Sequence, residues 1–321
     1  MPQWTLDDMI PMEGKTAVIT GANTGITLSC PSLLVYTHCN DYLVGIGYVA
    51  CKALLQNGAK TYMMSRDSQK SREAIERMKQ ETGKDAVELI PIDLSDLHSV
   101  RKAAEMFLSK ESRLDVLMNN AGVMMTPTKD LTKDGYDLQF GVNVLAHFHL
   151  TSLLLPALLA VPSPRIINLS SEMHRRGPKN GIEWDTLKGP KKRSWFPVLD
   201  TMASIKLYSQ SKLGNILHAN EISRRYSDRG LVAISVHPGV IASELSRNLD
   251  FISRRFLTAT AGSTSTGALT QLYAANSPEA QKLSGKYLVP IARVEEPLAI
   301  ANDQELAKKM WDWCENELKS F

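Results

Sequence analysis

The sequence predicts a doubly wound α/β fold in which a mostly seven-stranded parallel sheet carries helices on both faces. Short runs of apolar and β-branched residues alternate with longer segments whose apolar residues recur about every 3.6 positions. A glycine-rich run, TGANTG, follows the first of the short runs directly. This alternation is typical of parallel βαβ units, and ligands bind beyond the carboxyl ends of the strands in such sheets.

Seven short segments are expected to form the strands, because each is apolar and is bounded by turn-forming residues. In chain order they are Lys15–Thr20, Ala59–Ser65, Val87–Asp93, Leu114–Asn120, Arg165–Ser171, Val232–His237 and Lys286–Pro290. Longer segments with helical periodicity lie between them, namely Ser71–Gly83, Asp96–Lys110, Tyr136–Leu159 and Tyr208–Gly230. These helices would cover the two faces of the sheet.

A single domain is expected from residue 14 to residue 292, between an N-terminal extension (1–13) and a C-terminal helical segment (293–321). In the last segment, MWDWCENEL predicts an amphipathic helix, with Trp311 and Trp313 packing on the core or edging the pocket. The N-terminus has no signal-peptide pattern, and the apolar run Leu150–Val161 is too short to span a bilayer. We therefore expect a cytoplasmic protein without a membrane span.

Composition and spacing disfavour nucleic acid and metal ions as partners. The 37 basic and 34 acidic residues give a net charge of only +3, which provides no general attraction to nucleic acid. None of the four cysteines forms a CxxC pair, so free thiols are expected. His147 and His149 lie two positions apart on a predicted helix and so face different ways, and no carboxylate or cysteine is spaced to complete a metal site.

The ends of the first two strands predict a phosphate-binding site. Glycines in TGANTG, which contains Gly21, Asn23 and Gly25, allow a tight turn and bring backbone N–H groups to a pyrophosphate at a helix N-terminus. At the end of the second strand stands Arg66, where an NAD-selective protein usually has a carboxylate. A guanidinium there can bind a 2′-phosphate, which indicates NADP rather than NAD. A solvated arginine beside Asp67 is the alternative.

Six further motifs occur in a fixed order along the chain. They are IDLSD (92–96), NNAG (119–122), VNV (142–144), IINLSSEMH (166–174), YSQSK (208–212) and HPGVIASEL (237–245). With these motifs the sequence resembles the short-chain dehydrogenase/reductase family, most closely its retinol-dehydrogenase-like branch, from about Gly14 to Pro290. The resemblance implies a Rossmann-type fold and an oxidoreductase.

Tyr208 and Lys212 are the main candidates for catalysis. They are spaced i, i+4 on a predicted helix, so both side chains lie on one face. The lysine cation, with the nicotinamide charge nearby in the oxidised state, would lower the pKa of the tyrosine, which could then exchange a proton with a substrate oxygen. The resemblance implies that Ser171 binds that oxygen, while Ser170 points elsewhere, and that Asn143 holds a water that connects Lys212 to solvent. A structural asparagine is the alternative for Asn143.

The resemblance also assigns residues to an NADP(H) cofactor. It implies that Asp93 and Leu94 flank the adenine, and that Asn120, Ala121 and Gly122 pack beside the ribose. It places Pro238, Gly239 and Ser243 near the nicotinamide, where Tyr208 and Lys212 also meet the cofactor. Ile46 and Gly47 would complete the TGxxxGIG phosphate loop that Gly21, Asn23 and Gly25 begin.

Residues 26–45 interrupt that phosphate loop. Without them the text reads TGANTGIGYVACKALLQNG, which matches the family's loop and the helix after it. The insert is expected to separate Gly25 from Gly47, displace the helix start and impair cofactor binding. Two origins stay open. In the first, the segment is a translated, unspliced intron, which the codons of Gly25 and of Val44 and Gly45 permit. In the second, it is a surface excursion of the loop, and Gly45, Ile46 and Gly47 still supply the helix N-terminus.

The expected function is NADP(H)-dependent interconversion of a carbonyl and an alcohol on a small, lipophilic substrate, with Tyr208 as general acid and base. A homodimer through the two long helices is also possible from the resemblance. The basic groups Arg175, Arg176 and Lys191–Arg193 are expected on a solvated loop that edges the substrate pocket. The alternative function is a catalytically impaired binding protein on a dehydrogenase scaffold, because the insert interrupts the cofactor loop.

Overall fold

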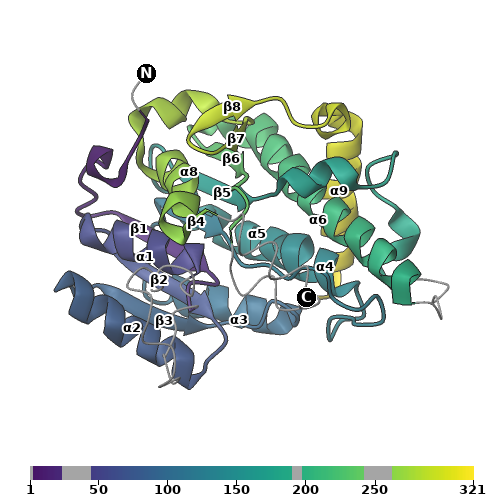
Figure 1. The fold of residues 1–321 in the computed structure, drawn as a ribbon. Coiled ribbons are helices and arrows are strands. Elements are labelled where there is room, and N and C mark those ends of the chain that lie inside the picture. The colour runs from purple at the N-terminus through teal and green to yellow at the C-terminus, as the bar shows by residue number, and fades with distance from the viewer. Residues whose placement is uncertain (1–2, 24–44, 190–196, 242–261) are drawn as a thin grey trace, which may run out of the picture.

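The computed structural model describes residues 3–23, 45–189, 197–241 and 262–321. Its eight strands form one sheet in the order β3-β2-β1-β4-β5-β6-β7-β8 (Figure 1). The strands are β1 (Thr16–Thr20), β2 (Lys60–Ser65), β3 (Val87–Pro91), β4 (Val116–Asn119), β5 (Arg165–Leu169), β6 (Val232–Val236), β7 (Tyr287–Val289) and β8 (Arg293–Glu295). Neighbours among β1–β7 pair in parallel, which confirms the predicted fold class.

Two differences from the predicted sheet concern its edges. Most strands end one or two residues earlier than expected, because residues such as Ser170, Ser171 and His237 leave the ladder and line the cavity described below. The eighth strand, β8, was missed. It pairs antiparallel with β7, so the segment after residue 292 contributes to the sheet as well as a helix.

Helices cover both faces of this sheet (Figure 1). They are α1 (Ile46–Gln56), α2 (Gln69–Thr82), α3 (Leu97–Leu108), α4 (Leu138–Phe140), the π-helical turn η3 (Gly141–Leu145), α5 (Ala146–Leu158), α6 (Pro197–Tyr226), α8 (Thr264–Asn276) and α9 (Gln304–Glu317). Short 3-10 helices include η1 (Leu6–Asp8), η4 (Glu172–Arg176), η5 (Trp184–Thr186), η6 (Ser227–Arg229), η8 (Pro278–Leu283), η9 (Ala299–Asn302) and η10 (Leu318–Ser320). One core cluster lies under α3, α5, α6 and α9, and the other under α1, α2 and α8.

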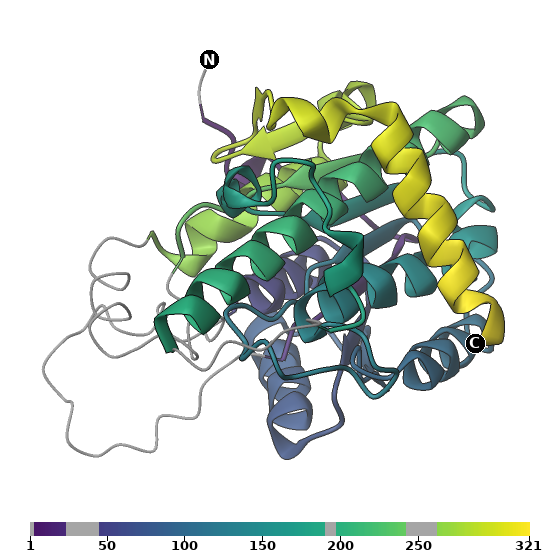
Figure 2. The ribbon, with the colours of Figure 1, turned by 90° about the vertical axis from the view of Figure 1, so that its right-hand side faces the viewer.

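The predicted C-terminal amphipathic helix is α9, which crosses the outer face of α6 (Figure 2). Trp311 is 4% exposed, and its ring packs edge-on against Phe148 of α5 at 4.7 Å between centroids. Trp313 contacts Tyr136 and Phe140. Both tryptophans therefore pack on the core, and neither lines the cavity.

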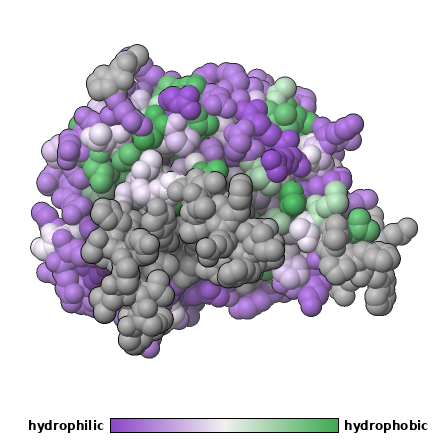
Figure 3. Space-filling view, in the orientation of Figure 1, coloured by the Kyte–Doolittle hydropathy of each residue, from purple (hydrophilic) through white to green (hydrophobic). Residues whose placement is uncertain are grey.

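One helix is longer than the sequence pattern indicated, and another lies within its predicted bounds. The helix with Tyr208 begins at Pro197, so part of the expected loop before the tyrosine is helical. The helical span Leu138–Leu158 has 21 residues and is apolar enough to cross a bilayer by length and composition, but 78% of that span is buried inside the fold. That burial is the one expected of a core helix. The face in Figure 3 is mostly hydrophilic, with smaller apolar patches.

Candidate active site

One cavity of about 1180 Å³ lies at the carboxyl ends of the strands. The strand order reverses between β1 and β4, so this is the place where a doubly wound sheet leaves room for a ligand. The cavity brings together these predicted residues: Gly21, Asn23, Ile46, Gly47, Arg66, Asp93, Leu94, Asn120, Ala121, Gly122, Ser171, Tyr208, Lys212, Pro238 and Gly239. Asn143 lies behind the cavity wall, and Gly25, Ser243 and residues 26–44 lie outside the described residues.

The two glycines on either side of the insert meet at one end of the cavity. Gly21 has a φ of +72°, and a Cβ on it would lie 2.9 Å from Ala121 Cα. A Cβ on Gly47 would overlap Asn120 Nδ2 and lie 2.9 Å from the carbonyl oxygen of Gly21. Gly45 is the extended N-cap of α1, whose first N–H groups have no partner within the helix. The site therefore has the close backbone approach that a pyrophosphate requires.

This arrangement corrects one expectation from the sequence. The insert was expected to displace the helix start, but α1 begins at Ile46 against the end of β1. The reason is that Gly45 supplies the N-cap and Gly47 packs against Asn120 and Gly21, so packing on the sheet fixes the helix start. The surface-excursion alternative fits this geometry, whereas the origin of residues 26–45 in the transcript stays a hypothesis.

The NNAG segment is fixed to the end of β1 by Thr20. Its hydroxyl oxygen accepts hydrogen bonds from the backbone N–H groups of Asn120 (3.0 Å) and Ala121 (2.9 Å). Asn120 Nδ2 donates to the carbonyl oxygen of Thr20 at 2.7 Å, while its buried Oδ1 has no partner among the described residues. An unpaired buried acceptor in the cavity wall suits a bound group with a hydroxyl or amide donor. Together with the glycine cradle, it indicates that these residues fit a dinucleotide.

Arg66 lies at the cavity wall, exposed, just after β2. Its neighbour Asp67 forms an ion pair with Arg72 at 2.6 Å. The backbone carbonyl of Arg66 accepts from Ser71 Oγ (2.6 Å), and Asn23 Nδ2 donates to the same hydroxyl oxygen (3.2 Å). The backbone at Arg66 is thus tied to the start of α2, and the guanidinium is placed beside the cavity.

Asp93 lines the cavity next to Leu94 with its carboxylate held in place. Burial alone would raise the pKa of Asp93, but hydrogen bonds from Ser95 and the nearby Lys133 ammonium lower it overall. The Lys133 Nζ lies 3.3 Å from Asp93 Oδ2. Asp93 therefore stays ionised and fixes the turn after β3 rather than serving as a proton donor.

Tyr208 and Lys212 lie on one face of α6, beside Ser171 at the end of β5. Tyr208 is 2% exposed, and Lys212 Nζ lies 5.6 Å from its ring centroid. Burial lowers the pKa of Lys212 to about 8, and Nζ donates to the carbonyl oxygen of Leu169 at 2.9 Å. Burial raises the pKa of Tyr208, and a hydrogen bond with the Ser171 side chain lowers it in part. Ser170 Oγ instead donates to the carbonyl oxygen of Lys212 at 2.7 Å, so it points away as expected.

The expected lowering of the Tyr208 pKa by Lys212 together with the oxidised nicotinamide stays a prediction. The lysine shares the buried environment, which itself disfavours the charged ammonium, and its Nζ bonds a backbone carbonyl. Ser171 is the group that lowers the phenol pKa here.

Asn143 occupies the π-helical turn η3 and is fully buried. Its Oδ1 accepts from the N–H of Val123 at 2.8 Å, and its Nδ2 donates to the Val123 carbonyl (3.0 Å) and to Ser211 Oγ (2.9 Å). A Cβ on Gly122 would lie 3.1 Å from Asn143 Oδ1 and 3.5 Å from Lys212 Nζ. The Asn143 side chain therefore positions the NNAG segment against α6, which agrees with the structural role given above as the alternative. The water relay through Asn143 stays a prediction.

His147 is a buried link rather than a metal ligand. Its Nδ1 donates to the carbonyl oxygen of Asn143 at 3.1 Å, so its Nε2 accepts from the Thr20 hydroxyl at 2.9 Å. Burial lowers its pKa to about 4, which keeps the ring neutral. Among the described residues, no group of three or more His, Cys, Asp or Glu side chains could hold a metal ion.

The substrate end of the cavity has apolar walls that the sequence reasoning did not identify. Its walls include Met124, Met125, Met173, Leu138, Val142 and Ile205, with Arg176 exposed among the lining residues. Met125 has a φ of +55°, and its N–H donates to Gln139 Oε1 at 2.9 Å. For the three methionines, the available signal was their position shortly after NNAG and SS. Arg176 thus edges the pocket as expected, whereas Arg175 forms ion pairs and Lys191–Arg193 lie outside the described residues.

Comparisons with known proteins agree with this geometry. Residues 41–186 match the family model for short chain dehydrogenase. A short-chain dehydrogenase/reductase of Armillaria gallica is 40% identical over 100% of this chain and 95% of its own length. Retinol dehydrogenase 12 of Mus musculus is 36% identical over 94% of this chain and 86% of its own.

The fold also has close counterparts among solved structures. An uncharacterized protein from Mycobacterium Paratuberculosis superposes with a TM-score of 0.70 and 30% identity, over 98% of this chain and 97% of its own. A short chain dehydrogenase from Escherichia coli CFT073, solved with NADPH, has a TM-score of 0.62 and 19% identity, over 88% and 98% of the two chains. The second likeness concerns the fold alone.

Proposed function

The chain belongs to the short-chain dehydrogenase/reductase family, and we propose that it is an NADP(H)-dependent oxidoreductase that interconverts a carbonyl compound and an alcohol. The observation that carries this proposal is a single cavity with two chemically different ends. One end has the glycine cradle at α1 and Arg66, which suit a phosphorylated dinucleotide. The other end has Tyr208 and Ser171 beside an apolar pocket.

The cofactor would be held by the N-terminus of α1 at its pyrophosphate, by Arg66 at the 2′-phosphate and by Asp93 and Leu94 at the adenine. When bound, NADP(H) supplies or accepts the hydride. Ser171 would donate a hydrogen bond to the substrate oxygen and hold it next to the Tyr208 hydroxyl. Tyr208 would donate its proton to that oxygen during reduction and remove it during oxidation. Lys212 would hold the Leu169 carbonyl and provide positive charge behind the phenol.

Arg66 offers a direct test of NADP selectivity. Replacing it with alanine is expected to weaken NADPH binding by about 10- to 100-fold, because charge-assisted hydrogen bonds to a phosphate contribute about 1.5 to 3 kcal/mol. NADH, which has no 2′-phosphate, should bind with unchanged affinity. Fluorescence titration of both nucleotides measures the difference.

Arg229→Ala is the matched control for this titration, because Arg229 is exposed and does not line the cavity. It should leave both affinities unchanged. If Arg66→Ala weakened NADPH and NADH equally, the guanidinium would not select the 2′-phosphate.

The substrate class follows from the pocket walls. Three methionines and the apolar side chains of Leu138 and Val142 favour a lipophilic aldehyde, ketone or alcohol, since methionine adapts its shape to varied apolar ligands. Reaction direction would follow the ratio of reduced to oxidised cofactor. The cytoplasmic location and the homodimer stay predictions.

The test of the proposed function has two steps. NADPH and NADH are first titrated onto this chain and onto a version without residues 26–45, and oxidation of bound NADPH is then followed with a panel of lipophilic aldehydes and ketones. We expect NADPH binding by both chains and turnover with members of the panel. NADPH binding by the shortened chain alone would instead support the impaired scaffold, whose basis was a displaced helix start.

A further inference from the structure

His174 lies three residues after Ser171 and is fully buried in the turn η4. Its Nδ1 is 2.7 Å from the carbonyl oxygen of Ser171, and its Nε2 is 3.0 Å from the backbone nitrogen of Leu298. A carbonyl oxygen only accepts and a backbone N–H only donates, so the two contacts fix one form of the ring. His174 must be neutral, with its proton on Nδ1.

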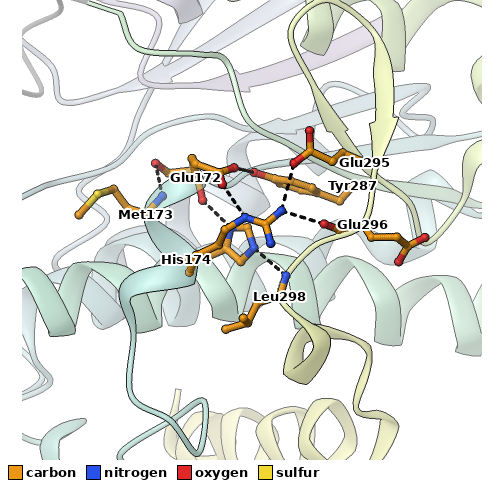
Figure 4. Close-up of polar contacts among 9 residues, drawn as sticks. Glu172, Met173, His174, Tyr287, Glu295, Glu296 and Leu298 are labelled. Atoms are coloured by element: carbon orange, nitrogen blue, oxygen red, sulfur yellow. Dashed lines mark hydrogen bonds and ion pairs between the residues drawn. The ribbon is translucent and has the colours of Figure 1, made fainter.

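The ring joins two distant parts of the chain (Figure 4). Ser171 follows β5 and is the N-cap of η4, whereas Leu298 follows β8 and is the N-cap of η9. The His174 ring also packs edge-on against Tyr287 of β7, with 5.1 Å between the centroids. The backbone of Ser171 is therefore tied to the C-terminal segment through one side chain.

A second link joins η4 to β8 and the residue after it, and its acceptors Glu172, Glu295 and Glu296 are labelled in Figure 4. Arg175 pairs with Glu172 at 2.5 Å and with Glu295 of β8 at 3.1 Å, and it donates to the carbonyl oxygen of Glu296 at 2.8 Å. These groups are partly exposed, so the ion pairs contribute little stability individually. The His174 link is buried, so loss of its hydrogen bonds would cost more stability, because water does not readily replace them there.

Ser171 depends on this turn for its orientation. Its carbonyl oxygen accepts from both the backbone N–H of His174 (3.0 Å) and Nδ1, and its hydroxyl oxygen accepts from the N–H of Met173 at 3.2 Å. Ser171 and Tyr208 both line the cavity, and the helix that carries Tyr208 packs against η4. A movement of η4 would thus carry the Ser171 hydroxyl away from Tyr208.

We propose that His174 is a positioning residue, which as the neutral Nδ1–H form ties Ser171 to the β8–η9 segment and so holds the Ser171 hydroxyl beside Tyr208. The inference rests on the proposed function. It gives the C-terminal segment a role in the chemistry, although Leu298 does not line the cavity. Burial also lowers the pKa of His174, which keeps the ring in the neutral form that both bonds need.

The sharpest test removes the donor without changing the histidine. Leu298 has a φ of −55°, which proline adopts, so Leu298→Pro deletes the N–H that His174 accepts. Leu298→Ala keeps that N–H and is the matched control for the lost side chain. We expect Leu298→Pro and His174→Ala to lower kcat about 10- to 100-fold with NADPH affinity unchanged, because small misplacement of a catalytic group costs this much.

His174→Asn adds a conservative variant. Its amide can still donate to the Ser171 carbonyl but is too short to reach Leu298, so it should retain more of kcat than His174→Ala does. Substrate turnover is measured with the carbonyl compound from the panel that gives the highest rate, and NADPH affinity by titration. A purely structural role would lower thermal stability and NADPH affinity together with kcat.

The outcomes separate the two proposals. If the wild-type chain turns over substrate and Leu298→Pro and His174→Ala keep the same rate, the positioning role is overturned and the proposed function is not. A wild-type chain that binds NADPH but reduces none of the panel would overturn the proposed function, and the positioning role with it. If His174→Ala does not fold, the comparison of Leu298→Pro with Leu298→Ala still decides the question.

Discussion

Replacing Tyr208 with phenylalanine is expected to lower the rate of carbonyl reduction by about 10²- to 10⁴-fold, the usual contribution of a positioned general acid. Phenylalanine keeps the buried ring and its packing on α6 but has no proton to give to the substrate oxygen. NADPH affinity should fall far less than the rate, because the glycine cradle and Arg66, which would hold the phosphates, lie at the other end of the cavity. The measurement is single-turnover oxidation of bound NADPH, paired with a titration.

Tyr226→Phe is the matched control, since Tyr226 ends the same helix and packs against Trp311, away from the cavity. It should retain the wild-type rate. The pH dependence of the reduction rate provides a second readout of the proton donor. Burial raises the pKa of Tyr208, so the phenol stays protonated in the free protein. If Tyr208→Phe kept the wild-type rate, the proton would have to come from another group.

Replacing Gly47 with alanine is expected to weaken NADPH binding at least about 10-fold, equivalent to about 1.4 kcal/mol. The new Cβ would overlap Asn120 Nδ2 and approach the Gly21 carbonyl oxygen to 2.9 Å, so α1 would have to move away from β1. In an open helix the same change would instead stabilise the helix by about 0.5 to 1 kcal/mol. NADPH titration and thermal unfolding together distinguish the two effects.

Gly177→Ala serves as the control for this substitution. Its new Cβ would have only ordinary contacts, the nearest at 3.5 Å, and its φ of −74° suits alanine. NADPH affinity should not change. Unaltered NADPH binding by Gly47→Ala would mean that the contact between α1 and the NNAG segment does not form the pyrophosphate site.

The sequence predicted the strands and the general architecture because apolar periodicity is a local property. The strands β1, β5 and β6 are mainly apolar and are buried along their whole length, as expected of strands covered on both faces. β8 was not predictable in this way, because Arg293, Val294 and Glu295 are all exposed and have no apolar pattern. The strand exists because it pairs with the edge of β7.

The interrupted phosphate loop shows the same limit at the site. Read along the chain, twenty residues separate Gly25 from Ile46, and the loop should be broken. In the fold, Gly47 lies against Gly21 and Asn120, since helix packing on the sheet, and not the length of the connection, fixes where α1 begins. Loop length itself adds only slowly to the cost of closing a chain.

By itself the sequence determined which chemical groups this protein uses and in what order they occur, from the glycines after β1 to Tyr208 and Lys212 on α6. Those assignments follow from residue type and short spacing, which the chain fixes locally. The tertiary structure alone decided which groups meet. In the fold, His174 lies between Ser171 and Leu298, and the backbone of Val123 forms hydrogen bonds with both Oδ1 and Nδ2 of Asn143. The contacts of His174 with Leu298 and of Asn143 with Val123 join separate segments of the chain, and only the packing of the fold brings their atoms within hydrogen-bond distance.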